Sequence, residues 1–327
     1  MPSCSMQGRT RTPARTTPKH EQPVTALGHV PGPVGTPLSG KPPGQETQRR
    51  GPAGYLLMVP GTLWLALFFV VPTVTLIASS LYDPSGSFAE GYAMTWHWQN
   101  YTDAWAEYAP TFLRSFLYAG AATVACVLLG FPLAYAIAFK AGRWRNLLLI
   151  AVIAPFFTSF LVRTLSWKLL LSDSGFVVGL FQAVPFVSDD FRLLATPAAV
   201  ITGLTYNFLP FMVLPLYASL EKVDPRLIEA AGDLYASPFT ALRLVTIPLA
   251  MPGLVAGTLL TFIPAAGDFI NAELLGNPTT RMIGNDINDL FKASVIPTAA
   301  ALSVTLMAMI VLMVLVYVRR AGTEELV

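Results

Sequence analysis

Long uncharged runs and short polar segments alternate along the chain after residue 54. A helix needs about 20 apolar residues to cross the hydrocarbon core of a bilayer. Six segments are long enough, and only the third contains charges, Arg163 and Lys168; they span residues 55–81, 115–139, 146–171, 193–220, 244–266 and 293–318. The pattern predicts an all-α integral membrane protein with six transmembrane helices.

The connections between these segments alternate in charge. Basic residues lie before the first segment, between the second and third, between the fourth and fifth, and after the sixth: Arg49, Arg50, Lys140, Arg143, Arg145, Lys222, Arg226, Arg243, Arg319 and Arg320. The other connections carry the acids Asp83, Glu90, Asp103, Glu107, Asp173, Asp189, Asp190, Asp268, Glu273, Asp286 and Asp289. The positive-inside rule therefore predicts that both termini are cytoplasmic and that the acidic connections are external.

Composition agrees with a membrane protein, since 54% of residues are hydrophobic and 12% are charged, against about 25% charged in soluble domains. Cys4 and Cys126 give no disulfide framework, and three scattered histidines give no metal-ligand spacing. We expect no catalytic residue, no metal and no cofactor in this chain.

Residues 1–50 are rich in Pro, Gly, Thr and Arg. Such a segment cannot bury enough apolar surface to fold, so it is predicted to be a disordered cytoplasmic tail ahead of a transmembrane domain of residues 51–327. Gly35–Lys41 resembles a phosphate-binding P-loop, but Pro42 replaces the residue that holds magnesium, and no strand precedes it. Any ATP chemistry is therefore expected to come from another polypeptide.

Two connections have further patterns. The first connection contains the aromatic residues Trp96, Trp98, Tyr101, Trp105 and Tyr108. They predict an interfacial aromatic belt with an amphipathic helix that lies on the membrane surface, and a ligand-binding role is the alternative. Residues 173–193 contain Ser-Gly and Pro breaks, which predict a short external segment that is re-entrant or lies on the surface.

The connection at 221–243 contains two helix starts. Asp224-Pro225 and Ser237-Pro238 each place an N-cap acceptor before a proline. An apolar stripe is predicted on the first helix, opposite Arg226, Glu229 and Asp233, and consists of Leu227, Ile228, Ala231, Leu234 and Tyr235. Like charges four residues apart cost a few tenths of a kcal/mol, which a partner surface would offset. A solvated face of an ordinary loop is the alternative.

Glu229-Ala230-Ala231, followed by Val245, Ile247 and Pro248, resembles the EAA signature of permeases in binding-protein-dependent ABC importers. Tyr235 stands where that signature has glycine. The resemblance implies the type I importer permease fold, with a short coupling helix that docks on a separate ATPase. The residues implied in coupling are Glu229, Ala230, Ala231, Asp233, Tyr235, Val245, Ile247 and Pro248.

Ionisable residues within or beside a span are costly and are candidates for a transport pathway. Arg163 either lines the pathway or extends its side chain to the outer headgroups. Lys168 is nearer the end of the segment and is expected to extend to the headgroups. Asp268 and Glu273 follow the fifth segment, and their alternative is a solvated loop face. Tyr206, Asn207 and Trp167 complete the set, with helix packing as the alternative for Asn207. Gly253 and Gly257 form a GxxxG pattern, which predicts close helix packing.

The stretches 135–157, 159–168, 203–231, 264–276 and 282–285 also resemble the first permease subunit of spermidine/putrescine importers. This resemblance covers almost all of the chain after the tail. It implies a multi-pass protein of the bacterial plasma membrane and alternating access driven by ATP and magnesium on a partner. The implied partners are an ABC ATPase dimer, a second homologous permease, an extracytoplasmic binding protein and the lipid bilayer, with no nucleic acid.

Carboxylates and aromatic faces suit a flexible polyamine cation. The alternatives are a permease of the same type for ferric iron, thiamine or a phosphonate, an ion-coupled secondary transporter, and a channel or scaffold without transport activity.

Overall fold

The structure is a computed structural model that describes residues 52–87, 90–182 and 192–321. Its contacts divide the chain after Leu57, and the architecture below is that of the second unit, residues 58–327. The predicted tail of residues 1–50, with its P-loop-like segment, lies outside the described residues, as do Asp189 and Asp190.

Regular structure in the described residues is helical, apart from two isolated β-bridges. Four helices are long and apolar enough to cross a membrane, and two bent helix pairs raise the number to six when each pair is taken as one span. The four are Met58–Ser79, Gln99–Lys140, Pro197–Leu220 and Ile296–Arg320. The all-α membrane fold predicted from the hydrophobic pattern is confirmed.

The first span consists of α1 (Pro52–Leu65), the π-helical turn η1 (Ala66–Val70) and α2 (Val71–Ser79). None of the residues in its apolar window is buried. An apolar helix with no buried side chain is stable only where lipid or another protein covers it. The span is therefore a peripheral element, which leaves the core to the other helices.

The core lies where α3 (Gln99–Tyr135), α7 (Pro197–Leu220) and α11 (Met251–Ala266) pack together. Small residues permit this close packing: a Cβ added at Gly253 would lie 2.5 Å from the Pro215 carbonyl oxygen, and one added at Gly257 would lie 2.8 Å from the Met212 sulfur. The GxxxG prediction is thus confirmed. Pro210 and Pro215 stand inside α7 without interrupting it, since neighbouring helices can compensate for the lost hydrogen bonds.

The third span is not the single helix that residues 146–171 predicted. After η3 (Gly142–Trp144) come α4 (Arg145–Ile153), the 3-10 turn η4 (Ala154–Phe157) and α5 (Phe160–Leu170), and the two halves meet at 97°. Thr158 and Ser159 are extended at the break (ψ 151° and 137°). Pro155 explains the break, because a proline removes a helical hydrogen bond and obstructs the preceding turn.

The fifth span is also bent. It begins with α9 (Pro238–Ala241), the π-helical turn η5 (Leu242–Thr246) and α10 (Ile247–Leu249), and it turns by 69° into α11. The span predicted over 244–266 is thus present, but it begins earlier, at Pro238, and is bent. Pro248 and Pro252 flank the bend at Ala250, and two missing N–H donors within five residues leave the helical ladder open there.

The predicted surface helix after the first span is also wrong. Tyr101, Trp105 and Tyr108 belong to α3, which begins at Gln99 and continues through Pro110 into the second span. Ala104 and Phe112 are buried against Leu302 of α14 (Ile296–Ala321). Contact with α14 therefore makes this stretch part of the bundle, and the short turn η2 (Ala136–Lys140) ends the span.

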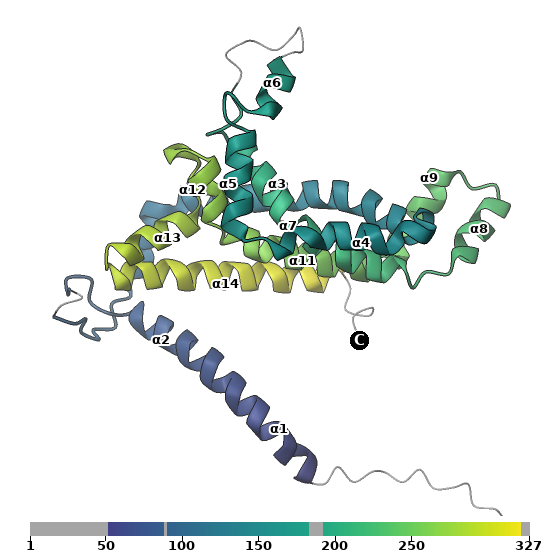
Figure 1. The fold of residues 1–327 in the computed structure, drawn as a ribbon. Helices are drawn as coiled ribbons and strands as arrows, with labels where there is room; N and C mark the ends of the chain where they lie inside the picture. Colours follow the sequence, from purple (N-terminus) through teal and green to yellow (C-terminus); the bar gives the residue numbers. More distant parts are fainter. Residues whose placement is uncertain (1–51, 88–89, 183–191, 322–327) are drawn as a thin grey trace, which may run out of the picture. The chain divides into compact units, whose positions relative to one another are not determined.

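Short helices lie at both ends of the bundle. α8 (Pro225–Asp233) and α9 follow the C-terminal end of α7, whereas α12 (Ile270–Leu275), the turn η6 (Pro278–Thr280) and α13 (Ile283–Lys292) follow the C-terminal end of α11. Figure 1 shows these two groups at opposite ends of α7 and α11. The predicted external segment contains α6 (Phe176–Gln182), after which residues 183–191 are not described.

Candidate functional site

The candidate coupling hairpin, residues 221–250, is built as its sequence predicts at both helix starts. The Asp224 carboxylate accepts a hydrogen bond from the Arg226 N–H (2.9 Å), and the Ser237 hydroxyl accepts one from the Thr240 N–H (3.2 Å). Each proline then occupies the first helical position, where no N–H is needed. These caps fix where the two short helices begin.

α8 ends at Asp233, so Leu234 and Tyr235 do not belong to the apolar stripe predicted for it. The Ala236 N–H donates to the Ala231 carbonyl and the Tyr235 N–H to the Gly232 carbonyl (3.1 and 2.9 Å), the two bonds of a Schellman motif. That motif needs a left-handed residue, and Tyr235 takes this role at φ 60°. Tyrosine thus adopts the conformation for which glycine is the usual residue.

The hairpin exposes both acids of α8 and much apolar surface. Glu229, Ala230 and Asp233 are exposed, and Ala231 is half-buried. Large apolar side chains that we name the hairpin patch are also exposed: Leu227, Leu234, Tyr235, Phe239 and Leu244. The Tyr235 side chain is 99% exposed. A patch of this kind on a soluble loop is typical of a surface that a partner covers.

The second half of the predicted coupling set lies where the hairpin joins the bundle. Val245 and Ile247 are half-buried on η5 and α10, and Pro248 is exposed beside the bend. Val223 and Ala241 are buried at the two sides of the hairpin base. The coupling residues therefore divide into an exposed helix and a joint, although their role in coupling stays a prediction.

Two of the predicted pathway residues meet across α5 and α7. The rings of Trp167 and Tyr206 pack edge to face, with centroids 5.2 Å apart. Both side chains are partly exposed. They form an aromatic pair whose rings are open to contact on part of their surface.

Arg163 lies one turn before Trp167 on α5 and is 9% exposed. Its guanidinium carbon lies 5.4 Å and 5.6 Å from the ring centroids of Phe156 and Phe160. The Nε and Nη1 atoms are buried without a hydrogen-bond partner. An arginine that reaches the headgroups would be extended and solvated, so this packed position does not fit that alternative.

Asn207 joins a buried polar network between α5, α7 and α12. Its Nδ2 donates to Asn271 Oδ1 (3.0 Å) and to Thr164 Oγ1 (3.2 Å). The Asn271 N–H in turn donates to Asp268 Oδ1 (2.8 Å), and Asp268 is itself buried. The network connects the α5 half of the bent third span to the segment that follows α11.

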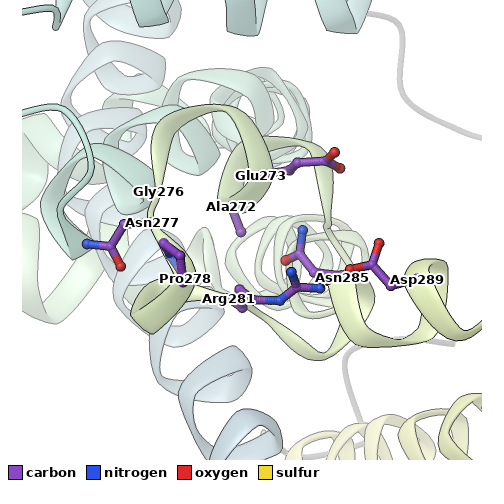
Figure 2. A pocket seen from close by; sticks show the side chains of 8 residues that line it. All are labelled: Ala272, Glu273, Gly276, Asn277, Pro278, Arg281, Asn285 and Asp289. Carbon is purple, nitrogen blue, oxygen red and sulfur yellow. Dashed lines mark hydrogen bonds and ion pairs between the residues drawn. The ribbon is translucent and has the colours of Figure 1, made fainter.

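Asp268 and Glu273 are separated by their surroundings. Glu273 is exposed on α12 and lines a pocket of about 220 Å³ together with Asn277, Arg281, Asn285 and Asp289. Figure 2 shows the Arg281 side chain directed toward Asp289, with Glu273 projecting from the neighbouring helix α12. The sequence predicted a pair of acids at this end of the protein, and the structure places one in the interior and one at the surface.

Arg281 holds the pocket together by two ion pairs, with Asp289 and with Asp286 (Nε to Oδ1, 3.3 Å). The hydrogen bond to Asp289 raises the pKa of Arg281. Burial raises the pKa of the Asp286 carboxyl, and Arg281 partly opposes that rise. Arg281 therefore offsets one of the two charges of its acidic partners, and Glu273 lies outside the ion pairs formed by Arg281, so that the pocket keeps a net negative charge.

Sequence reasoning missed Thr164, Asn271 and Arg281. The first two are single uncharged polar residues, and nothing in the linear pattern brings them beside Asn207. Arg281 is a single basic residue within the acidic connection that follows the fifth segment, and its ion pairs depend on the turn at η6. Among the described residues, no three His, Cys, Asp or Glu side chains are placed to hold a metal ion.

The chain is a helical membrane bundle with bent third and fifth spans and an exposed hairpin that leads from the fourth span into the fifth. The model of the family described as "binding-protein-dependent transport system inner membrane component" matches residues 52–321. The chain belongs to this family, so it is a multi-pass inner membrane permease component of an ABC importer.

Its similarity to individual proteins is most informative for two relatives. It is 40% identical over 259 residues to the spermidine/putrescine transport system permease protein PotB of Escherichia coli strain K12, covering 78% of this chain and 93% of that protein. It is 38% identical over 258 residues to the protein of the same name from Haemophilus influenzae, covering 78% and 90%.

Solved structures show the same fold at lower identity. A bacterial ABC transporter involved in the import of the acidic polysaccharide alginate matches with a TM-score of 0.61 at 18% identity, over 84% of this chain and 96% of that one. This likeness supports the arrangement of the helices and carries nothing about the solute.

Proposed function

We propose that this chain is a permease subunit of an ATP-driven importer of polyamines such as spermidine and putrescine. The observation that carries the proposal is the 38–40% identity to spermidine/putrescine permeases over 78% of the chain. The chain works by alternating access beside a second homologous permease. The binding protein delivers the solute from outside, and a dimeric ATPase with its own ATP and magnesium supplies the energy, so this chain has no ATPase site.

The hairpin is the part that receives the motion of the ATPase. Glu229, Ala230 and Ala231 form the docking contact, because alanines permit close approach and an exposed carboxylate can pair with a basic or hydroxyl group. The hairpin patch supplies apolar area around that contact. Val245, Ile247 and Pro248 lie at the joint through which a displaced hairpin moves α11.

The hairpin is cytoplasmic in this proposal, as are both termini. The alternation of basic and acidic connections supports this orientation. It also places Glu273 and its pocket at the external end, where a solute arrives.

The pathway residues suit a cation with methylene spacers. Trp167 and Tyr206 offer aromatic faces, and Asp268 and Glu273 offer carboxylates at different depths. Arg163 takes no part in binding a polycation, since its positive charge repels one, and its contacts with Phe156 and Phe160 support a role in holding the bend of the third span.

Uptake of labelled spermidine by the assembled complex in proteoliposomes tests the proposal. We expect ATP-dependent uptake that excess putrescine reduces and that ferric iron, thiamine and a phosphonate leave unchanged. Uptake of one of those three solutes in place of spermidine would support the assignment as an importer permease and refute polyamines as its solute.

Glu229→Lys tests the coupling role. Reversing a charge at a buried contact costs about 2–5 kcal/mol, so we expect uptake to fall at least about thirtyfold while the amount of inserted protein stays the same. Glu107→Lys is the matched control, because it makes the same charge change on an exposed residue of α3 at the other end of the bundle. Normal ATP-coupled uptake by Glu229→Lys would refute the assignment.

A further inference from the structure

One arginine ties the base of the hairpin to a different span. Arg145 is the first residue of α4, and its Nη2 forms an ion pair with Glu221. Its Nε donates a hydrogen bond to the Tyr217 hydroxyl, and its guanidinium carbon lies 5.0 Å from the Tyr217 ring centroid. A single planar side chain thus makes three contacts with the end of α7. We name Arg145, Tyr217 and Glu221 the root clamp.

These contacts use properties that are specific to arginine. The guanidinium fork can donate in two directions and stack on an aromatic ring, which a lysine ammonium cannot do in the same way. The Arg145 hydrogen bond lowers the pKa of Glu221, so this carboxyl stays charged at neutral pH. The two side chains are 34% and 47% exposed, and exposed ion pairs contribute about 0–1 kcal/mol to stability. The root clamp is therefore better suited to fixing geometry than to holding the fold.

Its position determines what it can do. Glu221 caps α7, and its N–H donates to the Tyr217 carbonyl (2.8 Å). Pro225 begins α8 four residues later, and Val223 between them is buried. The other side of the hairpin returns to the bundle through α10 and α11, whose Gly253 lies against the α7 backbone. Leu149 and Val152 of α4 also pack against the apolar cluster at this end of α7, and Arg145 adds a polar, directional link between the same two helices.

We propose that Arg145, Tyr217 and Glu221 are positioning residues for energy coupling: they join the N-terminal side of the coupling hairpin to α4, so that hairpin movement also drives the third span. This inference rests on the proposed function. It explains how a displacement at α8 reaches α5, which carries Trp167 and Arg163, although α5 lies beyond the 97° bend from α4. Docking of the ATPase itself depends on Glu229 and not on the root clamp.

The test compares two single charge reversals with their combination. Arg145→Glu and Glu221→Arg are each reconstituted with the ATPase, the second permease and the binding protein, and labelled spermidine taken up per ATP hydrolysed is measured. We expect the ratio to fall about tenfold in each single variant, within the range of coupling between residues in one network, with ATPase co-purification unchanged. The double variant Arg145→Glu/Glu221→Arg restores the ion pair but not the stacking on Tyr217, so its ratio should recover to within about threefold of wild type.

Arg143→Glu is the matched control, since Arg143 lies two residues away and its guanidinium packs over Trp144. This control should keep the wild-type ratio. A wild-type ratio in Arg145→Glu, or a double variant no better than the singles, would overturn the proposal. A loss of co-purification would also overturn it, because the residues would then act in docking.

A second readout does not depend on the solute. Amide hydrogen exchange of residues 221–224 in the full complex should accelerate in both single variants and slow again in the double variant. Failure of spermidine uptake by the wild-type complex would refute polyamine transport. Unchanged exchange in all variants would refute the positioning role of the root clamp.

Discussion

Two connections between spans are built from short helices: the hairpin of α8 and α9, and the segment of α12, η6 and α13. The hairpin leads from α7 to α11 and the other segment leads from α11 to α14, so they lie at opposite ends of α7 and α11 (Figure 1). They differ in how much of their surface the rest of the chain covers. That difference distinguishes a segment held within this chain from one whose apolar surface is left for a partner in the proposed function.

The α12–α13 segment is anchored on several sides. Met282, Ile283 and Asn285 are buried, the Ser115 hydroxyl accepts a hydrogen bond from the Ile283 N–H (2.7 Å), and Asn285 Nδ2 donates to the Phe269 carbonyl (2.9 Å). α8, in contrast, has no buried residue, and the hairpin patch is exposed. Burial and hydrogen bonding thus fix one segment, whereas the other keeps its apolar surface available.

The largest expected effect is on partner binding. Leu227→Asp places a charge in the hairpin patch, and loss of a central interface contact typically costs more than about 2 kcal/mol. We expect the ATPase retained on the purified permease to fall about thirtyfold, measured by co-purification. Phe291→Asp on α13 makes the same kind of change at a similarly exposed residue (53% against 49%) and should leave retention unchanged. Equal losses in both variants would remove the distinction between the segments.

The next effect is on stability and compares two glycines. A Cβ added at Gly284 would lie 2.6 Å from the Gly267 carbonyl oxygen, whereas one added at Gly232 meets nothing within 4 Å. Gly284→Ala should destabilise the bundle by about 1–3 kcal/mol because backbone must shift. Gly232→Ala should stabilise α8 by about 0.5–1 kcal/mol because alanine favours the helix.

Thermal unfolding in detergent distinguishes these outcomes. We expect the Tm of Gly284→Ala to fall by about 3–10 °C and that of Gly232→Ala to stay at the wild-type value, since α8 opens separately from the bundle. An undiminished Tm in Gly284→Ala would show that the α12–α13 segment is less constrained than its packing indicates.

The smallest effect concerns Tyr235. Its left-handed backbone costs a non-glycine residue about 1–2 kcal/mol, and its exposed ring forms no packing within the chain that glycine would lose. Tyr235→Gly should therefore reduce local opening of the hairpin and slow trypsin cleavage at Arg226 and Arg243 about fivefold. Ala236→Gly, one residue later, adds flexibility without relieving φ and should not slow cleavage. Faster cleavage of Tyr235→Gly would show that the left-handed backbone of Tyr235 is not strained.

The sequence predicted well what depends on local pattern. Length and hydrophobicity located the spans, and the side chains of Asp224 and Ser237 located the helix starts in the hairpin, because capping involves residues two or three positions apart. The spacing of Gly253 and Gly257 predicted their close contact. Each of these features depends on a few neighbouring positions.

Features that depend on tertiary contacts were not predictable in this way. Pro155, Pro248 and Pro252 were visible, but prolines also stand inside α7 without a break, so that the sequence alone did not tell which of them bend a span. The burial of Asp268 and the exposure of Glu273 depend on how α12 folds back on α5 and α7. The continuation of α3 through Trp105 likewise depends on contact with α14.

The bends of the third and fifth spans have a mechanical consequence. A straight helix pushed along its axis transmits a push, whereas two halves that meet near a right angle convert the same push into a sideways swing of the far half. With bends of 97° and 69°, the third and fifth spans would each act in the proposed function as an angled lever. A small displacement of the hairpin would then move Trp167 of the Trp167–Tyr206 pair sideways, and no helix would have to slide along its neighbours.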